Sequence, residues 1–194
     1  DNSSGSYDIN IGGGWDNDDT YTRGTETITF DAASGTHSID ADGTGAQDLY
    51  HVVFDDGGGT ATWQLTANFL WVDGNMTLTD GIFDLNNYYW YSLGNLNKTG
   101  GTIEMDQASD AMIFRGTFTI SGADGTNNFT DGSIQVWDDV NISGDNTFVF
   151  GGAGTPRFYF SGALDPTISM SGLNNQMGSS SSSSYFDTSL TGST

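Results

Sequence analysis

The feature that most constrains this chain is a short segment that returns at nearly regular intervals. The segment "TDGIFDL" at 79–85 comes back as "TGGTIEM" at 99–105 and as "TDGSIQV" at 130–136. In each copy, a Thr-Asp/Gly-Gly turn precedes two apolar residues that flank a polar one. A turn followed by this alternation predicts a short strand that buries one face and exposes the other. Because the pattern recurs while the residues change, we expect stacked structural repeats.

The repeat has a period of about 21 residues. The segment "WVDGNMTLTDGIFDL" aligns without gaps on "YSLGNLNKTGGTIEM", whereas the copy at 130–136 lies half a period out of step. We therefore expect that copy to form an equivalent strand on another face of the fold. Turn glycines that mark the repeats occur at Gly13, Gly35, Gly59, Gly81, Gly101, Gly122 and Gly144.

Composition indicates an all-β fold. Lys and Arg together number four and Glu occurs only twice, although exposed helix faces depend on these residues. Gly, Thr, Asn, Asp and Ser dominate instead, which is typical of short strands joined by turns. With about three short strands per period, the sequence predicts a parallel β-helix, or β-solenoid, of about eight coils. A β-sandwich or jelly roll is the alternative. A leucine-rich repeat is not expected, because its Leu/Asn frame is absent.

The chain divides into one domain and a tail. Residues 1–177 are expected to form a single β-solenoid domain, since 194 residues is the length of one domain. Residues 178–194 begin as a Ser-rich, low-complexity linker in which nothing local offsets the entropy of ordering. We expect this tail to be disordered unless it docks on another surface, and a neighbouring copy of the chain is the natural candidate.

Charge and cysteine content limit the partners and the location. The formal net charge is −21 and the chain has no Cys. So much negative charge disfavours nucleic acid and anionic membrane surfaces, and suits cations. No apolar run of about 18 residues occurs, so no membrane insertion is expected. The scarcity of charged helix formers, the richness in Gly, Thr and Asn and the lack of Cys indicate an exported protein.

Two long segments resemble a known class of proteins. They are "GTETITFDAASGTHSIDADGTGAQDLYHVVFDD" at 24–56 and "FLWVDGNMTLTDGIFDLNNYYWYSLGNLNKTGGTIEM" at 69–105. Both resemble the Gly/Thr/Asn-rich β-helical repeats of large secreted and surface-anchored bacterial proteins, which include adhesins and autotransporter-like passengers. The resemblance covers roughly residues 9 to 172 and consists mostly of turn patterns. It implies an extracellular or cell-surface, non-enzymatic scaffold or adhesive role and supplies no catalytic residues. The chain differs in being short and rich in aromatic residues.

Two acidic segments are candidate calcium sites. Clustered carboxylates on a glycine-kinked loop offer the hard oxygen ligands that Ca²⁺ requires. The first segment falls short of an EF-hand loop, because Ser38 and Leu49 would occupy its first and last ligand positions. Solvated Asp turns are the alternative for both segments. The candidate ligands are Asp40, Asp42 and Asp48 in "DADGTGAQD", and Asp16, Asp18 and Asp19 in "WDNDDTY".

A run of four aromatic residues is a candidate interaction surface. In a strand, alternate residues face opposite sides, so two of the four are expected to face outward. Exposed rings form subunit interfaces or stack on sugars. We favour an interface and place carbohydrate stacking second; packing in the core and on neighbouring coils is the alternative. The candidates are Tyr88, Tyr89, Trp90 and Tyr91, together with Trp71 and Trp137.

Five Asn-X-Ser/Thr sequons occur. In an exported protein they are acceptor sites for glycans, although chance explains most of them in a chain so rich in Asn, Thr and Ser. The sequons begin at Asn2, Asn75, Asn97, Asn128 and Asn141.

Catalysis has little support in the sequence. The two histidines, His37 and His51, have no nucleophile motif beside them. Asp pairs occur at 55–56 and at 138–139, but adjacent residues of a strand point to opposite faces. We therefore do not expect an enzyme. Polysaccharide degradation, which needs two facing carboxylates, is the third functional alternative.

The leading hypothesis is a structural subunit of an extracellular fibre, filament or sheath. A solenoid exposes unpaired strands at its ends, and the sequence shows no amphipathic helix or charged cap at either end. Uncapped ends can add the next subunit head to tail, giving a homopolymer, aided by exposed aromatics and by calcium. Small irregular caps at residues 1–14 and in the tail are the alternative. A glycan- or surface-binding adhesin module is the second hypothesis.

Overall fold

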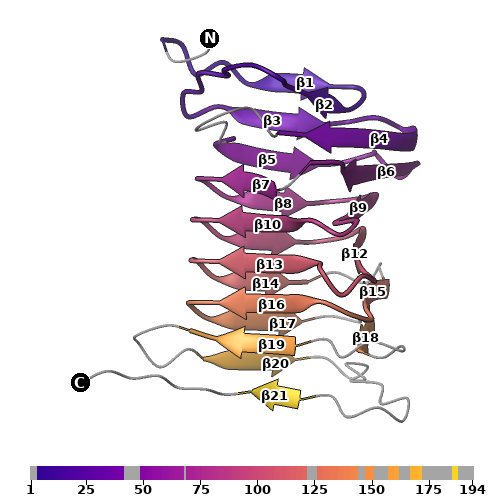
Figure 1. Ribbon diagram of the computed structural model, residues 1–194, viewed down its shortest axis with the longest axis vertical. Helices are drawn as coiled ribbons and strands as arrows, with labels where there is room; N and C mark the ends of the chain where they lie inside the picture. The colour runs from indigo at the N-terminus through magenta and orange to yellow at the C-terminus, as the bar shows by residue number, and fades with distance from the viewer. Residues whose placement is uncertain are drawn as a thin grey trace.

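The computed structural model describes residues 4–41, 49–67, 69–121, 126–143, 147–150, 157–161, 167–171 and 185–187 of the 194-residue chain. These residues form strands and turns without a helix, and all the strand pairs among them are parallel. The strands stack as a β-solenoid of about six turns with a period of roughly 22 residues. Figure 1 shows the stack as a rod, with the N-terminal strands at one end and β21 towards the other.

Three parallel sheets run along the rod. Sheet A contains, in order, β1 (Ile9–Ile11), β3 (Thr27–Phe30), β5 (His51–Phe54), β8 (Met76–Leu78), β11 (Leu96–Lys98), β14 (Phe118–Ile120), β17 (Val140–Ser143) and β20 (Ile168–Ser171). Sheet B contains β2 (Trp15–Asp16), β4 (Ser34–Asp40), β6 (Thr60–Leu65), β9 (Ile82–Asp84), β12 (Thr102–Met105), β15 (Thr126–Phe129) and β18 (Thr147–Phe150). Sheet C contains β7 (Phe69–Val72), β10 (Tyr89–Ser92), β13 (Ala111–Phe114), β16 (Ser133–Val136), β19 (Arg157–Phe160) and β21 (Tyr185–Asp187).

The predicted β-solenoid is confirmed, and the β-sandwich alternative is excluded. The eight strands of sheet A match the expected eight coils, although only about six turns are complete. The half-period shift of the third repeat is also explained. Phe83 in β9 and Ile103 in β12 lie side by side in sheet B, whereas Ile134 belongs to β16 of sheet C.

The core consists of apolar columns that run along the rod. Because the strands are in register, inward side chains from successive coils lie above one another; Ile11, Phe30 and Phe54 begin one such column in sheet A. The rings of Phe30 and Phe54 stack with centroids 5.0 Å apart, and Phe54 stacks on Phe83 across the core at 4.9 Å. Each coil therefore buries its apolar face largely against the coils next to it.

The glycine of the repeated turn is required by both conformation and space. Gly81 and Gly101 have φ values of 80° and 64°, in the left-handed region that side chains with a Cβ disfavour. A Cβ on Gly81 would lie 2.6 Å from the Trp63 ring, and one on Gly101 would lie 2.5 Å from the carbonyl oxygen of Gly81. The turn can be stacked on its neighbours only because no side chain is present.

Asparagine side chains hold a second corner together. The Oδ1 of Asn75 accepts a hydrogen bond from the backbone N–H of Asn95 on the next coil at 3.0 Å. The Oδ1 of Asn95 accepts one from the backbone N–H of Thr117 at 2.8 Å. This ladder continues the backbone pairing around a turn, where the strands themselves have ended.

The described part of the tail is a single strand. β21 pairs in parallel with β19 of its own chain, with Phe186 beside Phe158. Docking of the tail on a neighbouring copy stays a prediction, since the remainder of 178–194 lies outside the described residues.

Candidate functional site

The outer face of sheet C carries two rows of aromatic rings. Phe69 and Tyr89 occupy one position on adjacent coils, and Trp71 and Tyr91 occupy the position two residues on. The first pair is nearly parallel, with an interplanar angle of 7° and centroids 5.9 Å apart. The second pair is closer, at 4.1 Å and 30°. Stacking of this kind stabilises neighbouring strands by about 1 kcal/mol per pair beyond burial.

This face is also unusually apolar at its surface. Phe69, Tyr89 and Leu93 are 38%, 46% and 43% exposed, and they are three of the four large exposed hydrophobic residues in the described chain. Leu93 directly follows β10. A contiguous apolar patch of this type marks an interaction surface more often than isolated exposed side chains do.

The predicted aromatic cluster divides between this face and the core. Tyr89 and Tyr91 face outward, as expected for alternate residues of a strand. Trp90 lies between them and is wholly buried, with its ring 4.6 Å from that of Phe114. Tyr88 precedes the strand and packs partly against the core. The inclusion of Trp90 in an exposed surface is therefore wrong, because the same alternation that exposes its neighbours turns it inward.

Arginine side chains join this aromatic face from later coils. The Nε–H of Arg115 donates to the hydroxyl of Tyr91 at 2.8 Å, and its guanidinium carbon lies 4.2 Å from the ring centroid of Trp137. Arg157 opens β19 and donates from Nη1 to the Tyr159 hydroxyl at 3.3 Å. Cations over aromatic rings gain electrostatic attraction to the ring face. The face is thus aromatic and cationic in a chain of net charge −21.

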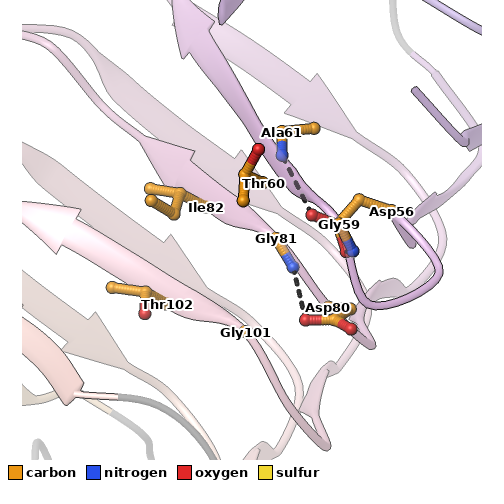
Figure 2. A pocket seen from close by; sticks show the side chains of 9 residues that line it. All are labelled: Asp56, Gly59, Thr60, Ala61, Asp80, Gly81, Ile82, Gly101 and Thr102. Atoms are coloured by element: carbon orange, nitrogen blue, oxygen red, sulfur yellow. Dashed lines mark hydrogen bonds between the residues drawn. The ribbon is translucent and has the colours of Figure 1, made fainter. Parts of the chain in front are cut away.

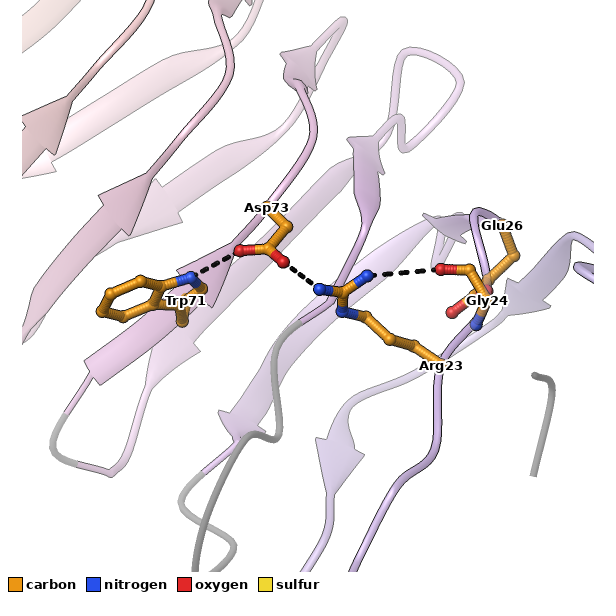
Figure 3. Close-up of polar contacts among 5 residues, drawn as sticks. All are labelled: Arg23, Gly24, Glu26, Trp71 and Asp73. Carbon is orange, nitrogen blue, oxygen red and sulfur yellow. Dashed lines mark hydrogen bonds and ion pairs between the residues drawn. The ribbon is translucent and has the colours of Figure 1, made fainter.

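The remaining arginine closes the N-terminal edge of the same face (Figure 3). Trp71 donates from Nε1 to Oδ1 of Asp73 at 2.7 Å, and Oδ2 of Asp73 forms an ion pair with Arg23. The guanidinium of Arg23 also lies 5.4 Å from the centroid of the Tyr50 ring. Arg23 stands between β2 and β3, so this contact ties the first coils to the beginning of sheet C.

Several residues of this face were not predicted. Phe69, Leu93 and Arg115 were missed, although the gapless alignment of 71–85 on 91–105 already places Trp71 over Tyr91. Extending that alignment by two residues would have paired Phe69 with Tyr89. Arg115 had no such signal, because its partners Tyr91 and Trp137 come from other coils.

The predicted calcium ligands are only partly brought together. Asp16 and Asp40 are direct neighbours on adjacent coils of sheet B, while Asp18 and Asp19 are exposed in the turn after β2. Asp42 and Asp48 lie outside the described residues. Within the described part of the chain, no group of three or more acidic or histidine side chains is placed to hold a metal ion. Calcium binding therefore stays a prediction.

The sequons lie in different settings. Asn75 is exposed, but its Oδ1 belongs to the corner ladder. Asn97 is exposed in the middle of β11, and Asn141 is half-buried in β17. Asn128 lies in β15, and neither its side chain nor Asn2 is among the described features. Glycosylation stays a prediction at all five positions.

A groove of about 290 Å³ lies at the glycine corner before sheet B (Figure 2). Its polar groups serve the turns that form it. The buried Asp56 carboxylate accepts hydrogen bonds from the backbone N–H groups of Gly59 (3.0 Å) and Ala61 (2.9 Å), and Asp80 accepts one from Gly81 (2.9 Å). Both carboxylates thus hold the turns that form the groove.

The histidines also have structural partners. A ring nitrogen of His37, Nε2, lies 2.9 Å from the carbonyl oxygen of Ser34. Nδ1 of His51 accepts the backbone N–H of Asn75 at 2.9 Å. These contacts hold turns in place.

Two of the buried ionisable groups, Lys98 and Asp110, have pKa values shifted by burial. Burial lowers the pKa of Lys98 from 10.5 to about 8, and its Nζ has no hydrogen-bond partner among the described residues. Burial raises the pKa of Asp110 from 3.8 to about 6, although the N–H groups of Gln107 and Asn87 donate to its carboxylate. The sequence did not single out either residue.

Comparison with protein family models, curated proteins and solved structures gives no match. None of the described residues forms a helix that is long and apolar enough to cross a membrane.

Proposed function

We propose that the chain is a structural subunit of an extracellular self-assembling fibre, which grows by strand addition at the N-terminal end of the solenoid. The observation that carries this proposal is the state of that end. β1 and β2 are the terminal strands of sheets A and B, and no described strand pairs with their outer edges. Such an edge is a template for another chain.

The backbone and side chains of β1 both suit this addition. The carbonyl oxygen of Ile11 accepts the N–H of Asp31 in the inner direction, so the N–H and C=O groups of Asn10 point to the open edge. Ile9 and Ile11 continue the inward columns of sheet A but are only partly buried. A further coil from another copy would form hydrogen bonds with the backbone groups of Asn10. It would also bury the side chains of Ile9 and Ile11.

A proline at Asn10 tests the proposal. Pro removes the outward N–H and is tolerated at a sheet edge, so Asn10→Pro should leave the subunit folded but stop its growth. Asn10→Ala, which keeps the N–H, is the matched control. Electron microscopy should show filaments of uniform width for the parent and for Asn10→Ala, and dispersed particles for Asn10→Pro. Filaments of unchanged length from Asn10→Pro would refute growth at this edge.

The same microscopy, repeated after chelation, tests the proposed role of calcium. Loss of filaments on chelation would support neutralisation of the Asp surface by Ca²⁺. Filaments that persist after chelation would contradict a role for Ca²⁺ in assembly and would favour solvated turns for the Asp segments.

An adhesin module is the second candidate function, favoured by the exposure of Tyr89 and Phe69 on sheet C. It predicts a monomer that binds neutral glycans through this face. Tyr89→Ala should then abolish glycan binding without changing the association state. Each ring of the two stacked pairs already has one face against its partner, which leaves less ring surface for sugars and favours the fibre.

A further inference from the structure

The three outer faces of the solenoid differ in their chemistry. The strands of sheet A contain no acidic residue and present mainly Thr, Asn and Ser. Strands β7, β10, β13, β16 and β19 of sheet C also contain none, and this face presents Arg115 and Arg157 beside its aromatic rows. All the acidic strand residues of sheet B stand on its outer face: Asp16, Asp40, Asp84 and Glu104.

The carboxylates of sheet B are stacked on one another. Asp84 and Glu104 are direct neighbours on adjacent coils, and so are Asp16 and Asp40. Like charges at directly opposed positions destabilise a sheet. Gln64 donates to Asp84 at 2.7 Å, but an amide does not offset the charge. A cationic surface laid across these coils would meet a row of carboxylates of one sign.

From β7 to β19, the outer face of sheet C is such a surface. The side chain of Arg115 is exposed and makes no ion pair with any described residue. Its Nε is held by Tyr91, which leaves the outer edge of the guanidinium for a carboxylate. Leu93 and Arg115 directly follow the paired residues Ser92 and Phe114, and Tyr89 begins β10 on the same face; Leu93 and Tyr89 both keep exposed apolar surface.

We propose that the outer face of sheet C of one copy docks on the outer face of sheet B of a second copy, with guanidinium groups on carboxylates and the aromatic rows between them. The two faces are different patches of one molecule, so the contact is heterologous and repeats from copy to copy. Solenoids are thereby joined side by side. This contact rests on the proposed role as a self-associating subunit but uses a different surface from the β1 edge.

Charge complementarity favours this partner over two others. Two sheet C faces would oppose arginine with arginine. An acidic polysaccharide would meet a molecule of net charge −21, which repels polyanions at all but this face. A second copy supplies carboxylates on adjacent coils of sheet B, to be met by Arg115 after β13 and Arg157 in β19, which have β16 between them.

Charge reversal tests the contact in an Asn10→Pro background, where end-to-end growth is blocked. The C-face variant carries Arg115→Glu with Arg157→Glu, and the B-face variant carries Asp84→Lys with Glu104→Lys. Circular dichroism establishes that both are folded; Glu104→Lys alone replaces the B-face variant if it is not. Asn97→Glu with Asn141→Glu, on sheet A, is a control that adds negative charge elsewhere.

Sedimentation velocity should show self-association of the parent at about 50 mM salt and at least a tenfold weakening at about 500 mM. Each variant alone should be monomeric, an equimolar mixture of the two should associate again, and the sheet A control should behave as the parent does. A monomeric parent, or a C-face variant that associates as the parent does, would overturn the proposal. So would a monomeric parent that binds polygalacturonate through the C face. With Asn10 intact, failure of the lateral contact alone leaves filaments that do not bundle, whereas failure of strand addition leaves no filaments.

Discussion

Lys98 should be the most destabilising single residue in the core. It continues an inward column of sheet A, between Leu78 on one coil and Ile120 on the next, and its side chain is wholly buried. Its Nζ has no hydrogen-bond partner among the described residues. An ammonium group in such a place has lost its hydration without gaining a counter-charge.

The cost of this lysine follows from its pKa, which burial lowers from 10.5 to about 8. Each pKa unit corresponds to about 1.4 kcal/mol, so the charged form is destabilised by about 3 kcal/mol relative to the unfolded chain. The cost is fully present below pH 8, where both states are protonated. Between pH 8 and pH 10.5 only the unfolded state holds the proton, so stability rises with pH.

Lys98→Met replaces the ammonium group with an apolar chain of similar length. We expect the free energy of unfolding at pH 7 to rise by about 2 to 3 kcal/mol, and the pH-dependent gain above pH 8 to disappear. Urea denaturation followed by tryptophan fluorescence at pH 7 and at pH 10 measures both effects. Asn97→Met, at the exposed neighbouring position, is the control and should change stability by less than about 0.5 kcal/mol.

A Lys98→Met protein less stable than the parent at pH 7 would refute this reasoning, since it would mean that the ammonium group has a stabilising partner. A variant that keeps the parent's gain in stability between pH 8 and pH 10.5 would refute the assignment of that gain to Lys98.

Two further predictions concern the turns. Gly81→Ala should destabilise the fold by at least about 2 kcal/mol, because its Cβ would meet the Trp63 ring. Gly57→Ala, which shares a positive φ but has open space around it, should cost only about 1 kcal/mol, and equal losses in thermal melts would contradict the steric explanation. The raised pKa of Asp110, about 6, means that its carboxyl favours the folded state below pH 3.8 and that this advantage is lost as the pH rises through 6. The stability difference between the parent and Asp110→Asn should therefore shift by about 3 kcal/mol between pH 3.5 and pH 7, and a constant difference in urea midpoints would exclude this titration.

The repeat could be predicted from the sequence because every coil must stack on its neighbours and therefore needs the same residue pattern. Glycine at the turn and alternation after it are required wherever one coil lies on another, so the solenoid and the shifted strand around Ile134 could be predicted. The outward direction of Tyr89 and Tyr91 follows from the same alternation. The gapless alignment also places Lys98 at the position of the buried Leu78. The burial of Lys98 could therefore have been predicted from the pattern.

The side-chain contacts between coils were harder to predict from the sequence, because the loops change the length of the repeat. Register partners in sheet C are 20 residues apart between Phe69 and Tyr89 but 24 between Ser133 and Arg157. Without a constant spacing, the sequence does not show which coil an exposed side chain meets. The neighbours Asp16 and Asp40 were accordingly assigned to two separate sites, although they share one face.

The ion pair between Arg23 and Asp73 has a consequence for how the rod melts. A stack of coils held only by nearest neighbours loses its terminal coils one at a time. This pair joins residues 50 positions apart, more than two periods of roughly 22 residues. The N-terminal coils should therefore fray as one cooperative block. Until that block opens, the exposed edge of β1 keeps the shape that an incoming strand must match.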